Sequence, residues 1–260
     1  MRTLTAGLSE FFFENRRGTM EKPVIIALDF ASAAQTNEFL EHFTTQENLW
    51  VKVGMELFYG EGPALIRSLR ERGLHVFLDL KLYDIPHTVQ QAMAQIGRLG
   101  VELTTVTGLG GAHMITAAKT GLLDGAHEAG IEKPKLLAVT QLTSMTESAM
   151  HETLQNNQTS MVDSVVHLAQ LAAESGADGV ISSALEAPAI HQQTPEGFLT
   201  INPGIRLLSD ATDDQARVVT PQQAAEQGSN GIVVGRSITK AANPLKAYQQ
   251  VKFEFEQEYQ

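Results

Sequence analysis

The sequence contains no cysteine among its 260 residues. This absence excludes disulfide bonds, zinc-thiolate sites, iron–sulfur clusters and a cysteine nucleophile. No apolar stretch reaches the length of a membrane span. Positive charge is also scarce, because 19 Lys and Arg stand against 30 Asp and Glu and give a formal net charge of −11. Binding to nucleic acid or to a membrane surface needs a basic face, so we expect neither partner. Nothing requires an oxidising compartment, and we expect a cytoplasmic protein.

The first 19 residues differ from the rest of the chain. Phe11–Phe13 is too short for the apolar region of a signal peptide, and no small-residue cleavage site follows it. Met20 precedes the first strand-like run. We interpret Met1–Thr19 as a leader, a tag or a mis-called start, with a short structured arm as the alternative. Residues 20–260 are expected to form one catalytic domain.

From Val24 onward, β-rich runs alternate with stretches of helical periodicity. The β-rich runs are Val24–Phe30, Leu49–Met55, His75–Leu82, Leu103–Thr107, Lys135–Leu142, Gly179–Ser183, Phe198–Pro203 and Gly231–Val234. The helical stretches include Pro63–Arg72, Thr88–Leu99, Ser160–Glu174 and Pro244–Gln257. Strand followed by helix, repeated about eight times, predicts an α/β fold of the (β/α)8 (TIM) barrel type. An open doubly wound sheet is the alternative, which the lack of Gly-x-Gly-x-x-Gly after the first run weakens.

Charged residues stand near the carboxyl ends of the first three runs. Asp29 and Lys52 belong to the first two, Asp79 and Lys81 alternate with apolar residues in the third, and Asp84 follows it. Because alternate residues of a strand face opposite sides, Asp79 and Lys81 should point together into the barrel mouth. By themselves they fit a buried ion pair at the barrel rim as well as a catalytic pair. Asp29 and Lys52 favour the catalytic interpretation. Several charges that converge on one barrel mouth are an unfavourable way to gain stability, so they indicate a function.

Phosphate would bind in the other half of the mouth. Gly235 and Arg236 follow the eighth run, and Arg206 follows the seventh. The loops after strands seven and eight are the usual phosphate site of this barrel. Glycine lets the backbone approach an anion, and arginine offers a forked donor. Ile205–Thr220 is polar and, at about 15 residues, long enough for a mobile lid, with a solvated loop of no function as the alternative.

The segment from Asp79 to Thr88 reads Asp-Leu-Lys-Leu-Tyr-Asp-Ile-Pro-His-Thr. It resembles the Asp-x-Lys-x-x-Asp-Ile-Pro-x-Thr signature of the orotidine 5′-phosphate decarboxylase family, in its bacterial form. Further matching motifs are Ala27-Leu28-Asp29, Lys52-Val53-Gly54, Gln141-Leu142-Thr143-Ser144, Asn202-Pro203-Gly204-Ile205-Arg206 and Val234-Gly235-Arg236. The resemblance implies an enzyme that converts orotidine 5′-phosphate to uridine 5′-phosphate, the last step of de novo synthesis of that nucleotide. It also implies that the reaction uses no metal and no other cofactor, and that the protein is a homodimer.

The resemblance further implies roles at the reacting end of the substrate. Asp29 and Lys52 would hold the ribose hydroxyls, Asp79 would lie beside the substrate carboxylate, and Lys81 would stabilise the carbanion and deliver the proton. Three residues would come from the partner subunit and complete its neighbour's site: Asp84, Ile85 and Thr88.

The same resemblance implies how the base and the phosphate bind. Thr143 would lie against the pyrimidine edge, and Pro203 would line the base pocket. Four residues would grip the phosphate or lie close to it: Arg206, Gln215, Gly235 and Arg236.

Two other functions stay open. The relatives 3-keto-gulonate 6-phosphate decarboxylase and hexulose-phosphate synthase are similar around Asp-x-Lys-x-x-Asp, but they carry a magnesium-binding glutamate where this chain has Lys52. A lysine there repels a metal. The non-enzymatic alternative is a sugar-phosphate sensor on the same fold, which would gain nothing from a proton donor such as Lys81.

Overall fold

A computed structural model of the chain describes residues 22–132, 134–208 and 218–257. The segment Met1–Thr19 and the predicted phosphate ligand Gln215 lie outside these residues. Eight parallel strands follow one another around a closed barrel. Their bounds are β1 Val24–Ala27, β2 Trp50–Val53, β3 His75–Leu82, β4 Leu103–Thr107, β5 Lys135–Val139, β6 Gly179–Ile181, β7 Leu199–Asn202 and β8 Gly231–Val234. The predicted (β/α)8 barrel is therefore confirmed.

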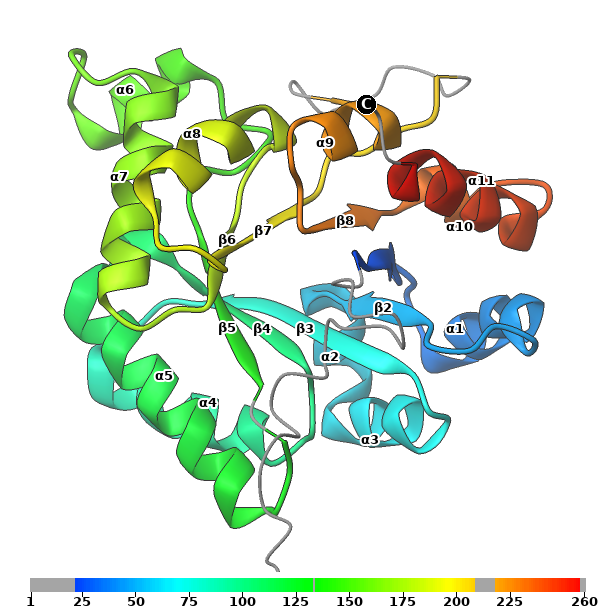
Figure 1. Cartoon of the computed structure of the whole chain (residues 1–260). Coiled ribbons are helices and arrows are strands. Elements are labelled where there is room, and N and C mark those ends of the chain that lie inside the picture. The colour runs from blue at the N-terminus through cyan, green and yellow to red at the C-terminus, as the bar shows by residue number, and fades with distance from the viewer. Residues whose placement is uncertain (1–21, 133, 209–217, 258–260) are drawn as a thin grey trace, which may run out of the picture.

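Helices surround the barrel, as Figure 1 shows. The α-helices are α1 Ala33–Leu40, α2 Met55–Glu61, α3 Pro63–Glu71, α4 Pro86–Gly97, α5 Gly111–Glu128, α6 Glu147–Leu154, α7 Met161–Glu174, α8 Ala187–Gln193, α9 Pro221–Glu226, α10 Arg236–Thr239 and α11 Pro244–Glu256. Short 3-10 helices cover η1 Glu41–Phe43, η2 Gly108–Gly110 and η3 Ala184–Glu186. Pro63 and Pro244 occupy first helical turns as predicted, where proline leaves no helix hydrogen bond unmade.

Alternation along the strands separates two apolar cores. One fills the barrel interior and includes Ile25, Trp50, Phe77 and Leu103. The other lies between the strands and the helices and includes Leu78 of β3. The strands are therefore covered on both faces, as expected for a parallel barrel. A polar side chain on an inward-facing position can reach only the barrel interior or one of the barrel's two ends.

Helices α4 and α5 lie unusually close together. A Cβ atom added at Gly121 or Gly125 of α5 would come within 2.0 Å of the Gln90 carbonyl oxygen or 1.9 Å of the Ala94 carbonyl oxygen in α4. Only glycine permits this approach of two backbones. The contact fixes α4 against the barrel, and with it the chain segment that leads from β3 into α4.

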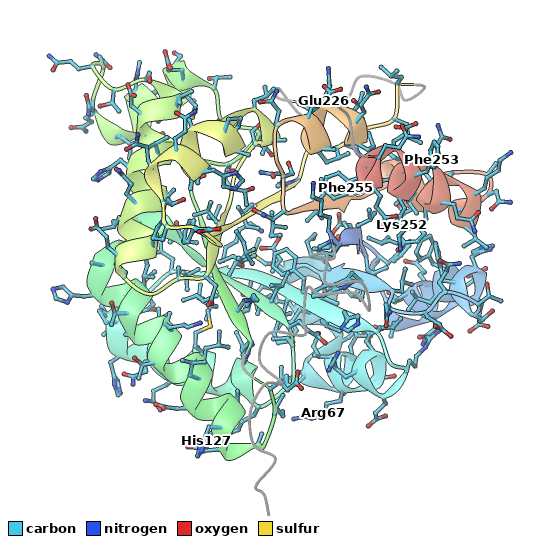
Figure 2. The ribbon with its side chains drawn as sticks, in the orientation of Figure 1. Arg67, His127, Glu226, Lys252, Phe253 and Phe255 are labelled. Carbon is cyan, nitrogen blue, oxygen red and sulfur yellow. The ribbon has the colours of Figure 1, made fainter. Side chains whose placement is uncertain are left out.

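The last helix closes the ring of helices against the first helical segment. Tyr248 of α11 packs edge-on against Phe43 of η1, with ring centroids 5.8 Å apart. On the same helix Phe255 is buried and Phe253 is exposed, and both are labelled in Figure 2. Within the described residues, no helix is both long and apolar enough to span a membrane.

Several strands end earlier than their apolar runs predict. The first run was predicted to continue to Phe30, but β1 ends at Ala27, and β5 ends at Val139 instead of Leu142. Met55 was assigned to the second strand but begins α2. In each case the residues beyond the true strand end leave the ladder and turn around the barrel mouth. Of the apolar residues beyond these strand ends, Phe30 packs against the outer core, whereas Met55 and Leu142 are exposed.

Candidate active site

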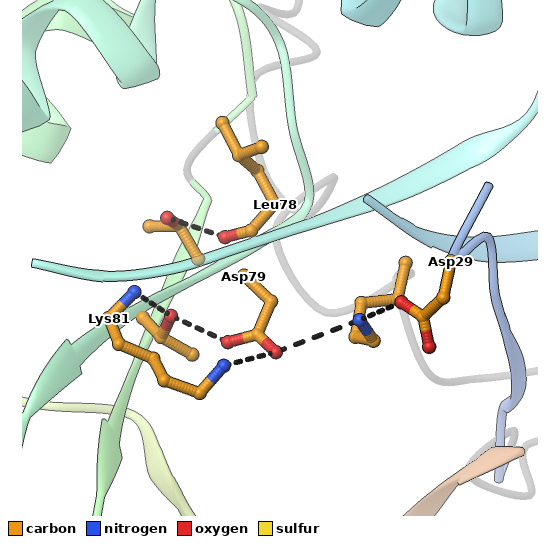
Figure 3. A network of polar contacts seen from close by, with 7 residues as sticks. Asp29, Leu78, Asp79 and Lys81 are labelled. Carbon is orange, nitrogen blue, oxygen red and sulfur yellow. Dashed lines mark hydrogen bonds and ion pairs between the residues drawn. The ribbon is translucent and has the colours of Figure 1, made fainter. Parts of the chain in front are cut away.

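Four charged side chains form a continuous chain at the carboxyl end of the barrel, which we call the charge chain: Asp29, Lys52, Asp79 and Lys81. The Lys52 ammonium lies 3.1 Å from Asp29 Oδ1 and 3.9 Å from Asp79 Oδ2. The Lys81 ammonium lies 2.8 Å from the same Asp79 Oδ2. Figure 3 follows these contacts from Lys81 through Asp79 to Asp29. Negative and positive charges alternate along the charge chain, so each charged group has an oppositely charged neighbour.

The four groups differ in their contact with solvent. The Asp79 and Lys52 side chains are 11% and 12% exposed, while those of Lys81 and Asp29 are 30% and 64% exposed. The central pair of charges is therefore shielded, and the two ends open toward the barrel mouth. Gly54 preserves this arrangement, since a Cβ atom there would lie 3.2 Å from the Lys52 ammonium nitrogen.

Strand β3 is irregular where it carries Asp79 and Lys81. Its pairing with β4 passes from Leu78↔Thr104 to Leu82↔Val106, so four steps along β3 match two along β4. Lys81 has a φ of 52°, a left-handed conformation that non-glycine residues seldom adopt. Bulges next to active sites turn side chains in new directions. Here the irregularity belongs to the segment of β3 that presents Asp79 and Lys81.

A buried threonine that the sequence analysis missed holds these two residues. The Thr105 hydroxyl donates to Asp79 Oδ1 at 2.9 Å and accepts from the Lys81 backbone N–H at 2.9 Å. Its position on β4 was visible in the sequence, but it is one of three threonines in the five-residue run Leu103–Thr107 and does not stand out there. The run itself gave no indication of the irregular register, which brings this hydroxyl beside both residues.

A cleft of about 630 Å³ opens beside the charge chain. Its walls include Asp29 and Lys52 on one side and residues from the ends of β7 and β8 on the other. The latter include four of the predicted ligands: Pro203, Arg206, Gly235 and Arg236. The volume lies within the usual range of small-molecule sites. The structure thus brings the predicted ribose, base and phosphate residues of β1, β2, β7 and β8 together around one space.

The loop that follows β7 is closed at its base. Ile205 pairs with Val219 in an isolated bridge, and the Arg206 N–H donates to the Val219 carbonyl oxygen at 3.0 Å. This bridge holds the backbone of Arg206 at the rim of the cleft. Most of the predicted lid, residues 209–217, lies outside the described part of the chain.

The predicted partner-contributed residues stand apart from the charge chain. Asp84, Ile85 and Thr88 are exposed, and Tyr83 beside them is 70% exposed. Asp84 Oδ1 accepts from the neighbouring Ile85 N–H at 2.7 Å, and Asp84 makes no ion pair with any described residue. Lys81 therefore has Asp79 but not Asp84 as its partner within the described chain.

Thr143 lies in the turn after β5 and is half-buried, but it is not among the residues that line the cleft. In the described ranges, no group of three or more His, Asp or Glu side chains is placed to hold a metal ion. The carboxylates of the charge chain have lysine ammonium groups as their close partners instead.

Comparison with known proteins gives one consistent family. The sequence pattern of the orotidine 5′-phosphate decarboxylase / HUMPS family matches residues 22–251. The chain is 52% identical to orotidine 5′-phosphate decarboxylase of Latilactobacillus sakei over 237 residues, which cover 91% of this chain and 99% of the relative. It is also 52% identical to the Enterococcus faecalis protein of that name over 228 residues, 88% of this chain and 95% of the relative. The crystal structure of orotidine 5′-phosphate decarboxylase from Lactobacillus acidophilus has a TM-score of 0.81 and 44% identity, and it covers 91% of this chain and 100% of the relative.

Proposed function

The chain belongs to the orotidine 5′-phosphate decarboxylase / HUMPS family, and from this premise we propose that it decarboxylates orotidine 5′-phosphate to uridine 5′-phosphate without a cofactor. The observation that carries the proposal is the charge chain: the Lys81 ammonium lies 2.8 Å from Asp79, and the other two members, Asp29 and Lys52, line the cleft. A structural ion pair would not require a lysine with left-handed backbone at the open end of a barrel.

The residues around the cleft fit the parts of this substrate. Asp29 and Lys52 offer an acceptor and a donor for the ribose hydroxyls, and Pro203 lines the wall where the base would lie. Gly235 and Arg236, with Arg206 nearby, would bind the phosphate, and Gln215 and Thr143 would contact the phosphate and the pyrimidine edge. Phosphate binding far from the reacting carbon provides binding energy that can be used in the transition state.

The chemistry then needs only charges and a proton. The bond between the ring carbon and the carboxylate breaks, carbon dioxide leaves, and the electron pair stays on the ring carbon in the plane of the ring. The Lys81 ammonium stabilises that carbanion and transfers one proton to it, and the resulting amine takes up a proton from solvent. Asp79 would lie beside the substrate carboxylate and favour its departure. Lys52 occupies the position of the magnesium ligand in relatives of different activity, which supports a metal-free reaction.

We also propose that the enzyme works as a homodimer in the cytoplasm and that residues 20–260 form its catalytic domain. The exposed segment Tyr83–Ile85 beside the mouth supports a partner at this position. In such a dimer Asp84, Ile85 and Thr88 would enter the neighbouring site. Two-fold symmetry makes the exchange reciprocal.

The direct test follows the ultraviolet absorbance of orotidine 5′-phosphate after the purified protein is added with no cofactor. We expect the absorbance to fall and uridine 5′-phosphate to form in equal amount. No conversion, or conversion of a 3-keto sugar phosphate instead, would contradict the proposal. Cell fractionation tests the expected location, and activity of a protein without Met1–Thr19 tests the domain boundary.

The dimer has a separate test. Lys81→Ala and Asp84→Ala proteins, each with little activity, are mixed under conditions that let subunits exchange. If Asp84 serves the neighbouring site, a mixed dimer has one intact site and one doubly damaged site, and statistical exchange restores about a quarter of all sites. If both residues serve the same chain, no activity returns although subunit exchange is confirmed.

A further inference from the structure

We propose that Thr105 is a positioning residue of this active site: its single hydroxyl fixes both the Asp79 carboxylate and the Lys81 backbone. The inference rests on the proposed decarboxylase function and adds a residue to it. Thr105 lies on β4, on the inward face, and is completely buried. It hydrogen-bonds to the two residues that would act on the substrate, and it does not itself line the cleft.

The direction of the two hydrogen bonds follows from elementary chemistry. The Lys81 backbone N–H can only donate, so the Thr105 oxygen must accept at 2.9 Å. The one proton of the hydroxyl is then available for Asp79 Oδ1, also at 2.9 Å. Asp79 Oδ1 is therefore an acceptor in this arrangement. Thr105 links an amide donor to a carboxylate acceptor in one unbroken line.

This hydroxyl fixes the orientation of the Asp79 carboxylate relative to the two lysines. With Oδ1 held by Thr105, Oδ2 lies 2.8 Å from the Lys81 ammonium and 3.9 Å from the Lys52 ammonium. Rotation of the carboxylate about its last bond would break all three relations together. Without the hydroxyl, the carboxylate can turn and the Lys81 ammonium loses a fixed partner. Small misplacements of reacting groups lower rates strongly.

The hydroxyl also replaces a hydrogen bond that the barrel ladder cannot make. Four steps of β3 match two of β4 around Lys81, whose φ is 52°. A buried backbone N–H without an acceptor is strongly unfavourable. The Thr105 oxygen satisfies the Lys81 N–H and so stabilises the local backbone that aims the lysine side chain.

The chain offers a matched control one residue away. Thr104 is as deeply buried as Thr105, and its hydroxyl donates to the Leu78 carbonyl oxygen at 3.0 Å. Because side chains alternate along a strand, Thr104 faces the opposite side of β4 from Thr105, and its hydroxyl bonds to Leu78 instead of Asp79 or Lys81. Replacing either threonine with valine removes one hydroxyl from the same strand and keeps the shape of the side chain.

The experiment compares Thr105→Val, Thr105→Ser and Thr104→Val in steady-state assays on orotidine 5′-phosphate, with calorimetric binding of the product uridine 5′-phosphate. For Thr105→Val we expect kcat to fall roughly 10- to 100-fold, because a buried hydrogen bond to a charged group is lost. We expect KM and product affinity to change by less than about threefold, since Asp79 would face only the departing carboxylate. Thr105→Ser should restore kcat to within about threefold, and Thr104→Val should leave it unchanged.

Equal kcat for Thr105→Val and Thr104→Val, with active wild type, would overturn the inference alone. If Thr105→Val does not fold, Thr105→Ala and Thr104→Ala replace the pair, because alanine fits any space left by threonine. A failure of both Thr105 variants to fold, while both Thr104 variants fold, would mean that Thr105 serves folding and would overturn the positioning role. Wild-type protein inactive on orotidine 5′-phosphate would overturn the proposed function and this inference with it.

Discussion

A cluster with a buried carboxylate lies near each end of strand β3, and the two clusters differ in their contacts. At the amino end of the barrel, Glu102 accepts from the Val76 N–H at 2.7 Å, contacts His75 at 3.0 Å and pairs with Arg70. At the carboxyl end, one oxygen of Asp79 lies near two lysine ammonium groups. Both clusters bury a carboxylate that pairs with a cation, but only the second adjoins the large cleft, through Lys52 and Asp29.

The amino-end cluster is closed by its own partners. His75 stacks on Trp50 with ring centroids 4.8 Å apart, and Arg70 also donates to the Leu74 carbonyl oxygen at 2.8 Å. The cavity beside it, about 110 Å³, is small. Every group there has a fixed backbone or side-chain contact, which is what a structural staple needs. At the carboxyl end the Lys81 ammonium has three donors and one carboxylate partner within the described chain. Buried charge alone therefore does not mark a site, whereas buried charge with unused hydrogen-bonding capacity beside a cleft does.

The largest effect is expected at the carboxyl end. Lys81→Ala removes the cation and the proposed proton donor, so kcat should fall by at least about a thousandfold while the melting temperature changes little. The control is Lys119→Ala, which removes another half-buried lysine. Its ammonium lies 2.5 Å from Asp178, which precedes β6 at the amino end of that strand. Comparable activity of the two variants would contradict the proposal that the cluster at the carboxyl end contains the active site.

An intermediate effect is expected at the end of the cleft where we propose that the phosphate binds. Arg236→Ala should raise KM for orotidine 5′-phosphate roughly 10- to 100-fold, because a charge-assisted hydrogen bond to phosphate is lost. The bare nucleoside orotidine serves as the internal control, and its slow turnover should be unchanged. Equal losses on nucleotide and nucleoside would assign Arg236 a structural role.

At the amino end the expected effect is on stability only. Glu102→Ala should lower the free energy of unfolding by about 2–3 kcal/mol, because the buried Val76 N–H and the Arg70 guanidinium lose their acceptor. Urea denaturation measures this change, and kcat of the folded protein should stay at the wild-type value. Glu128→Ala, which breaks the exposed pair with Arg98, is the control and should change stability by less than about 0.5 kcal/mol. A large loss of kcat in folded Glu102→Ala protein would contradict a purely structural role for Glu102.

No effect is expected from metal removal. Lysine ammonium groups neutralise the carboxylates of the charge chain, so exhaustive dialysis against EDTA should leave kcat unchanged. The assay is repeated after addition of magnesium to the dialysed protein. A strict requirement for magnesium would favour the relatives that carry a glutamate at the position of Lys52.

The sequence was sufficient to predict the barrel and the direction of the central charges. In β3 the apolar residues Val76, Leu78 and Leu80 pack in the outer core, and Asp79 lies on the other face as the alternation predicts. Alternation is a local property, so a sequence displays it directly. Strand ends were less predictable, because apolar residues such as Leu142 also occur beyond the last residue of a strand.

Contacts between strands could not be predicted in the same way. Thr105 and Glu102 act on residues of β3 and α3 that are 24 to 32 positions away in the chain. Their partners depend on the register between β3 and β4, including its two-residue irregularity. No local pattern encodes that register. A search restricted to carboxyl ends of strands also had no reason to consider Glu102, which precedes β4 at its amino end.

If Lys81 acts as we propose, its left-handed backbone places selection for thermal stability in conflict with selection for catalysis at a single position. Glycine would adopt this conformation at about 1 kcal/mol less than a residue with a side chain. In a laboratory evolution experiment that selects only for resistance to heat, Lys81 should be replaced by glycine or asparagine. In one that rewards growth without supplied pyrimidine, the lysine should be retained. Retention of lysine at position 81 therefore depends on selection for its side chain, because its backbone geometry alone favours replacement.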